Sequence, residues 1–157
     1  MADPVNQATI DLIKRNEGCV LHAYPDPATG GAPWTIGYGH TGSDVHPGLV
    51  ITQAKAEALL RADLAKFEDG VDDLIAESAD TTDNQFGAMV SLAYNIGLGN
   101  FKSSHVLLYH NQGHTFWAAN AFALWNKAAG RVLAGLTRRR AEERQLYLTP
   151  DPAEKSS

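Results

Sequence analysis

Two carboxyl side chains near the start of the chain have the surroundings of an acid paired with an ionised partner. Glu17 follows Ile10 and Ile13 at helical spacing and directly precedes Gly18, a residue typical of helix C-terminal caps. A carboxyl on the apolar face of a helix, at the negative end of its dipole, is favoured in the protonated form. Asp26 lies between two prolines in a polar turn, where we expect the ionised form. General acid catalysis with anionic stabilisation requires one carboxyl of each kind.

A hydroxyl and an imidazole follow a few residues later. The segment from Trp34 to His40 carries Thr35, and its alternating glycines predict a strand that another chain or a ligand can approach closely. These residues also have a simpler explanation, because glutamates at helix ends and aspartates in turns are common on protein surfaces. The catalytic interpretation therefore depends on the wider motif.

That wider motif, from Glu17 to Thr41, resembles the active-site signature of phage-type lysozymes, glycoside hydrolase family 24. It reads E-G-x-x-L-x-A-Y-x-D and then T-I-G-Y-G-H-T, after a loop somewhat longer than in the shortest family members. The second half of the chain is also similar to the family, with Q-F-x-A-M-V-S-L-A-Y-N-I-G and G-L-x-x-R-R. The resemblance covers about residues 8–148 and implies a catalytic triad of Glu17, Asp26 and Thr35.

This resemblance implies a phage endolysin with muramidase activity, which hydrolyses the β-1,4 bond from N-acetylmuramic acid to N-acetylglucosamine in peptidoglycan. Glu17 would protonate the departing glycosidic oxygen, Asp26 would stabilise positive charge on the sugar, and Thr35 would hold the attacking water. Nothing in the sequence forces the two carboxyls into contact, so we expect the separation of about 6.5–9.5 Å that accompanies inversion. No metal or organic cofactor is expected.

Three other functions fit parts of the sequence. A lytic transglycosylase would cleave the same bond with one glutamate and without water, so the presence of Asp26 and Thr35 weighs against it. A catalytically inactive wall-binding module is expected to lack a triad member, and all three are present. Membrane disruption through the arginine-rich last helix would predict killing that survives the loss of Glu17.

Five further residues are expected to contact saccharide. Trp34 belongs to the loop that carries the triad, and Arg139 matches a family arginine beside the saccharide cleft. The neighbouring Arg138 and Arg140 are instead expected on a solvated helix face with glutamate partners. The remaining members of the predicted substrate-binding set are His40, Tyr94 and Asn95.

Other candidate residues are expected to have structural roles. Trp117 and Trp125 have a spacing more typical of a core than of a sugar platform, and the single cysteine, Cys19, is expected to be a buried packing residue. The pattern H-x4-H-x3-H could suggest a metal site. A glycine interrupts the helix, however, and no cysteine or carboxylate stands nearby, which disfavours metal binding by His105, His110 and His114.

The composition fits one globular domain and excludes several classes of protein. The chain has 157 residues, 44% hydrophobic and 20% charged, and its net charge of −5 argues against a dedicated nucleic-acid binder. A single cysteine excludes an internal disulfide framework, and no run of 18 apolar residues is present. The first residues have neither the basic nor the apolar region of a signal peptide. We expect a monomer without stable membrane insertion, held in the host cytoplasm until a holin-type lesion admits it to the periplasm or cell wall.

The predicted fold is α+β and lysozyme-like, with a small β-rich lobe, a larger helical lobe, a long helix joining them and the active-site cleft between the lobes. Residues 1–150 form one catalytic domain, and residues 151–157 are expected to be a disordered tail. Within the domain, residues 19–50 form the β-rich lobe, residues 52–75 the linking helix, and residues 1–18 and 76–150 the helical lobe.

Local signals set the expected ends of the helices. Thr52 is a candidate N-cap for the long helix, and Gly70 is a candidate break within it. Thr82 and Gln85 form a predicted capping box at the start of the next helix. Further helices are expected near residues 104–110, 115–126 and 137–148.

Overall fold

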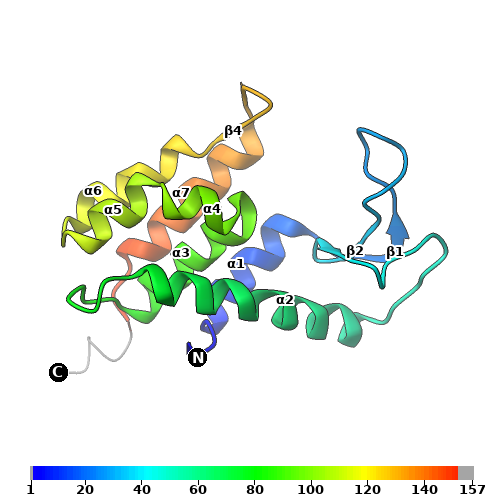
Figure 1. The fold of residues 1–157 in the computed structure, drawn as a ribbon, viewed down its shortest axis with the longest axis horizontal. Helices are drawn as coiled ribbons and strands as arrows, with labels where there is room; N and C mark the ends of the chain where they lie inside the picture. Colours follow the sequence, from blue (N-terminus) through cyan, green and yellow to red (C-terminus); the bar gives the residue numbers. More distant parts are fainter. Residues whose placement is uncertain (1, 152–157) are drawn as a thin grey trace. The chain divides into compact units, whose positions relative to one another are not determined.

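The structure is a computed structural model that describes residues 2–151, and its course is drawn in Figure 1. The chain divides into two compact units, one made of Lys14–Lys66 and the other of the chain up to Ile13 and from Phe67 onward. The divisions fall inside two helices, α1 (Gln7–Glu17) and α2 (Gln53–Leu74), so each helix contributes residues to both units.

The unit Lys14–Lys66 contains a three-stranded antiparallel sheet in the order β1–β2–β3. Its strands are short: β1 is Val20–Tyr24, β2 is Thr35–Gly37 and β3 is His40–Thr41. Ile36 in the central strand is fully buried. Gly37 has a φ of 65°, a conformation that glycine adopts without the steric cost of a side chain, and a Cβ there would lie 3.5 Å from the Cβ of Ala56 on α2. The expectation of short strands and turns over residues 19–50 is confirmed.

The ends of α1 and α2 in this unit have the predicted caps. Gly18 adopts a φ of 69° directly after α1 and donates its N–H to the carbonyl of Lys14. At the start of α2, the hydroxyl of Thr52 accepts a hydrogen bond from the N–H of Lys55 at 3.1 Å. Both helix ends are therefore fixed by interactions within a few residues.

The other unit is built around α3 (Asp83–Ile96), most of which is buried. Its start has the predicted capping box between Thr82 and Gln85. The C-terminal helix α7 (Ala134–Leu148) packs along α3, as the centre of this unit in Figure 1 shows. Shorter elements complete the unit: α4 (Leu98–Lys102), α5 (His105–Asn111), α6 (Thr115–Ala121) and the 3-10 helix η1 (Phe122–Leu124).

Several local expectations need correction. Gly70 does not end α2, which continues to Leu74; a Cβ at this position would lie 2.6 Å from a methyl carbon of Leu98, so the glycine permits close packing. The helix expected over residues 115–126 ends earlier, and a hairpin of β4 (Lys127–Ala128) and β5 (Arg131–Val132) precedes α7. In the described part of the chain, residues 2–151, no helix has the length and apolarity needed to cross a membrane.

The end of the described chain is also held in place. Asp151, expected to begin a disordered tail, accepts hydrogen bonds from the backbone N–H groups of Asp83 and Asn84 at 2.8 and 3.0 Å. Its carboxylate thus lies at the N-terminus of α3, where the helix dipole favours negative charge. The rest of the expected tail, residues 152–157, lies outside the described residues.

Candidate active site

Glu17 is the last residue of α1, and its side chain is half-buried. The same end of the helix is tied to α2, because Lys14 forms an ion pair with Glu57 and lies over the ring of Tyr38 at 5.5 Å. The hydrogen bond with Glu57 is the main reason that the pKa of Lys14 is raised. The helix end that carries Glu17 is therefore anchored on the turn between β2 and β3 and on α2.

Cys19 lies beside this anchor but differs from its expected role. It is exposed, and its thiol contacts the side-chain oxygen of Gln53 at 3.6 Å. The expectation of a buried packing thiol is wrong, because the turn at Gly18 directs the chain out of the helix before it enters β1.

Asp26 and Thr35 are joined through the β1–β2 hairpin. Thr35 pairs with Tyr24, and Asp26 lies two residues beyond Tyr24, at the start of the loop. Asp26 donates its N–H to the carbonyl of Gly31 at 2.9 Å and accepts from the N–H of Gly30 at 2.8 Å. These backbone bonds close the loop on Asp26, so its half-buried side chain and that of Thr35 come from the same end of the hairpin.

Glu17 lies at the other end of β1. It precedes Val20, whose partner in the sheet is Gly37, by three residues. The five residues of β1 therefore lie between the glutamate and the aspartate along the chain. The unit Lys14–Lys66 contains Glu17, Asp26 and Thr35 together, on α1, the hairpin loop and β2.

His40 belongs to the same unit and binds two carboxylates. Its Nδ1 lies 2.7 Å from Oδ2 of Asp63 on α2, and its Nε2 lies 3.0 Å from Oδ2 of Asp44. Desolvation lowers the pKa of His40, but the hydrogen bonds with Asp63 and Asp44 outweigh it and raise the pKa overall. The bond with His40 in turn lowers the pKa of Asp44. Both ring nitrogens therefore have protein partners, which connect β3 to α2 and to the loop after β3.

The predicted substrate-binding residues divide between the two units. Trp34, half-buried and adjacent to Thr35, belongs with His40 to the unit Lys14–Lys66. Tyr94 belongs to the other unit, where its ring packs edge-on against Phe67 at 5.3 Å. In the same unit, Asn95 is exposed at the end of α3 and its Oδ1 accepts a hydrogen bond.

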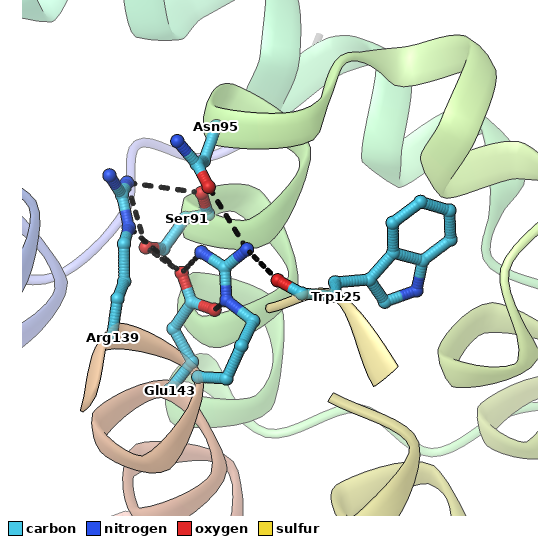
Figure 2. A network of polar contacts seen from close by, with 6 residues as sticks. Ser91, Asn95, Trp125, Arg139 and Glu143 are labelled. Carbon is cyan, nitrogen blue, oxygen red and sulfur yellow. Dashed lines mark hydrogen bonds and ion pairs between the residues drawn. The ribbon is translucent and has the colours of Figure 1, made fainter. Parts of the chain in front are cut away.

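The last predicted member, Arg139, belongs to a buried network of charged groups (Figure 2). Its side chain is only 3% exposed, and its Nε lies 3.3 Å from Oε2 of Glu143, which is fully buried. The hydroxyl of Ser91 on α3 donates to the same oxygen at 2.5 Å. Contact between Arg139 and saccharide stays a prediction, and the structure gives this guanidinium protein partners instead.

Arg140 completes the network, and the expectation that it lies on a solvated helix face is wrong. It is 1% exposed, and its Nε lies 2.6 Å from Oε1 of Glu143. Its Nη1 donates to Oδ1 of Asn95 at 3.0 Å and to the carbonyl of Trp125 at 3.1 Å. Burial raises the pKa of Glu143, while Arg140, Arg139 and Ser91 act against that shift. The helical spacing between the arginines and Glu143 was visible in the sequence, but their burial against α3 was not.

The three histidines considered as metal ligands have other partners. His110 is buried, with Nδ1 2.6 Å from the hydroxyl of Tyr147 and Nε2 2.7 Å from that of Thr81. His105 stacks on Tyr109 and His114 on Trp117. Across residues 2–151 no group of three or more histidine, cysteine, aspartate or glutamate side chains could hold a metal ion.

Trp117 also differs from expectation. The side chain is 56% exposed on α6, so its predicted place in the core is wrong. It packs edge-on against Tyr109 at a centroid distance of 5.6 Å. The sequence correctly predicted a helix that begins near residue 115 but wrongly placed this side chain in the core.

Comparison with known proteins agrees with the motif and with the fold. The phage lysozyme family model matches residues 14–143. The chain is 52% identical over 145 residues to an endolysin of Bacillus phage B103, covering 92% of this chain and 54% of that protein, and thus spans about half of its length. The muramidase domain of SpmX from Asticaccaulis excentricus is 41% identical, with a TM-score of 0.84 over 93% of this chain and 98% of that domain. A P22 lysozyme variant is 39% identical, with a TM-score of 0.82 over 94% and 99%. The α+β fold is therefore that of lysozymes, and the chain belongs to the phage lysozyme family.

Proposed function

We propose that this chain hydrolyses the β-1,4 bond between N-acetylmuramic acid and N-acetylglucosamine in bacterial peptidoglycan. The observation that carries the proposal is the presence of Glu17, Asp26 and Thr35 in one compact unit, within the residues that match the family model. The substrate class is inferred from the family and from the similarity of this chain to an endolysin and to a muramidase domain.

In the proposed reaction, Glu17 donates its proton to the departing glycosidic oxygen. Asp26 is ionised, stabilises the positive charge that develops on the sugar and orients water, and the hydroxyl of Thr35 holds that water. Proton transfer from a positioned acid contributes about 10²–10⁴-fold, and electrostatic stabilisation of the oxocarbenium-like state supplies much of the remainder. Glu17 and Asp26 come from different elements, the end of α1 and the β1–β2 loop, and neither backbone segment forces the two carboxyls into contact, which supports a gap that a water molecule can enter.

The experiment that tests this function follows the release of reducing ends from purified peptidoglycan by the wild type and by Glu17→Gln. We expect wild-type protein to release N-acetylmuramic acid with a free reducing end and the variant to release almost none. Anhydromuramic products would identify a lytic transglycosylase and contradict the hydrolytic mechanism. Absence of any cleavage by folded wild-type protein would contradict the proposed activity itself.

We also propose that the protein is made in the host cytoplasm and reaches the wall through a holin-type lesion. Expression in a bacterium without such a lesion should leave the culture intact until the membrane is permeabilised, for example with chloroform. Lysis that begins without permeabilisation would contradict this route. The same cultures expressing Glu17→Gln should not lyse after chloroform treatment.

A further inference from the structure

The distribution of charge along the chain is strongly uneven. The protein has 18 Asp and Glu residues and a net charge of −5, yet none of these carboxylates falls between Asn84 and Ala141. The same segment contains six Lys and Arg residues. Arg139 and Arg140 are buried against Glu143, and the four that remain are exposed: Lys102, Lys127, Arg131 and Arg138.

Large apolar side chains are exposed in the same segment. In residues 2–151 eight such side chains are exposed, and all except Leu21 and Val50 belong to the stretch from α5 to the start of α7. Phe116 is 61% exposed and Leu124 is 65% exposed, although most apolar residues of comparable size in this unit are buried. The six together form what we call the apolar edge: Leu108, Phe116, Trp117, Leu124, Val132 and Leu133.

The elements that carry the apolar edge are held together within one unit. In Figure 1, α6, the segment after it and the hairpin with β4 run along one border of this unit, coloured from yellow to orange. The carbonyl of Asn126 accepts from the N–H of Leu133 at 3.0 Å, which closes the hairpin next to η1. Ala129 and Gly130 both have positive φ, as in the tight turns that fit the twist of two-residue hairpins. Lys127 pairs with Val132 across this hairpin, so a cationic and an apolar side chain lie on the same face of it.

Exposed apolar and aromatic side chains beside cations, with no carboxylates in the same segment, are the features of proteins that bind reversibly at the surface of an anionic bilayer. We propose that the apolar edge, together with Lys127, Arg131 and Arg138, is a peripheral binding surface for membranes rich in anionic phospholipid. The apolar side chains would enter the headgroup region while the cations contact phosphate. An anionic wall polymer would attract the cations but would gain little from six exposed apolar groups, so charge and apolarity together favour lipid.

The surface is separate from the residues proposed for glycoside cleavage. Glu17, Asp26 and Thr35 belong to the unit Lys14–Lys66, whereas every residue of the apolar edge belongs to the other unit. Lipid binding and peptidoglycan hydrolysis can therefore be lost independently. This independence makes the two proposals distinguishable by experiment.

The test is vesicle flotation with the full chain, using vesicles of equal parts phosphatidylglycerol and phosphatidylcholine and vesicles of phosphatidylcholine alone. We expect wild-type protein to float with the anionic vesicles only. The variant Phe116→Ala/Leu124→Ala should lower the partition coefficient by about tenfold or more, because two exposed apolar side chains no longer enter the membrane. Lys127→Gln/Arg131→Gln should lower it by a similar factor, since each cation near an anionic surface contributes to binding.

Matched controls come from the other unit. Leu21→Ala/Val50→Ala removes two exposed apolar side chains, and Lys55→Gln/Arg61→Gln removes two exposed cations. Both controls, and Glu17→Gln, should float as the wild type does. All surface variants should retain turnover of purified peptidoglycan, which contains no lipid, and this turnover also shows that they are folded.

The proposal is overturned if wild-type protein does not float with anionic vesicles, or if the control variants lose flotation as much as the surface variants. It is also overturned if Phe116→Ala/Leu124→Ala floats as the wild type does while Lys127→Gln/Arg131→Gln does not. That result would mean that the cations alone attract any polyanion and that the apolar edge does not contact lipid.

Discussion

Thr35 is the direct partner of Tyr24 in the antiparallel β1–β2 pair, and this pairing fixes where the hairpin loop begins and ends. Asp26 enters the loop two residues after Tyr24, and its backbone closes the loop through Gly30 and Gly31. Two members of the proposed triad are therefore held by the hydrogen bonds of one hairpin. The third, Glu17, depends on the end of α1 and on the anchor between Lys14 and Glu57.

Replacing Glu17 by Gln should abolish hydrolysis while leaving the fold intact. The change removes the acid but keeps the shape of a half-buried side chain, so we expect activity to fall by about 10²-fold or more with little change in melting temperature. Reducing-end assays and thermal unfolding measure the two effects. Asp11→Asn, an exposed change on the same helix, is the control and should retain activity. Activity of more than a few per cent in Glu17→Gln would remove Glu17 from the role of acid.

Hydrolysis should proceed with inversion at the anomeric carbon. Cleavage of a β-linked substrate would then give the α anomer first, because water held by Asp26 and Thr35 attacks from the face opposite the leaving group. Proton NMR of the first product, recorded before mutarotation, identifies the anomer. A β anomer, or a covalent glycosyl adduct on Asp26, would contradict the proposed role of Thr35.

The ion pairs of His40 should stabilise the protein more at low pH than at high pH. The pKa of His40 is raised in the folded state. The contribution of His40 to the free energy of unfolding is therefore fully present below the unfolded pKa of about 6.5, and it is lost as the pH rises through the folded pKa. The difference in unfolding free energy between wild type and His40→Gln should therefore be largest near pH 6 and shrink above it. Denaturant unfolding at several pH values measures this difference.

The exposed His46 lies in the same unit and provides a matched control, because His46→Gln removes an imidazole whose Nδ1 lies 3.1 Å from the carbonyl oxygen of Pro47. Asp63→Asn should reproduce the effect of His40→Gln, because it removes the nearer of the two carboxylates. A difference that grows as pH rises would show that His40 does not gain its stability from the imidazolium form.

His110 should show the opposite dependence on pH. Burial lowers the pKa of His110, so the folded state favours the neutral ring. The contribution of this neutral ring to the free energy of unfolding is present above the unfolded pKa of about 6.5, and it is lost as the pH falls through the folded pKa. The variant His110→Gln should therefore differ from wild type most above pH 7 and least in acid. NMR titration of the ring protons offers a direct check, and an imidazole that protonates above pH 7 would contradict it.

Changes in the buried arginine network should reduce stability rather than substrate binding alone. Arg140→Ala leaves the fully buried Glu143 with fewer positive partners, and removing one side of a buried ion pair costs about 3–5 kcal/mol. The exposed Arg138→Ala should change the unfolding free energy by less than about 0.5 kcal/mol. Chemical denaturation compares the variants. Equal effects of Arg138→Ala and Arg140→Ala would contradict the buried network.

The sequence alone determined the features that depend on near neighbours in the chain. The caps at Gly18, Thr52 and Thr82 involve partners three or four residues away, so local residue types were sufficient to predict them. The triad candidates lie within a stretch of 19 residues, from Glu17 to Thr35, so one local motif was sufficient to propose all three, and their catalytic roles stay predictions. Helical periodicity likewise predicted α2 and α3, because long segments with regularly spaced apolar residues repeat the same signal many times.

Only the tertiary structure decided which face of a helix is covered and which distant groups meet. Arg140 is buried because α7 packs on α3 and brings it to Asn95, 45 residues away, whereas the aromatic side chain of Trp117 on α6 is exposed. The partner of His40 on α2 is 23 residues away. The β4–β5 hairpin has two residues in each strand, too few for an alternating pattern, and its turn includes Ala129 at positive φ. Burial, long-range pairing and short strands depend on the whole packed chain, and local residue preferences carry little information about them.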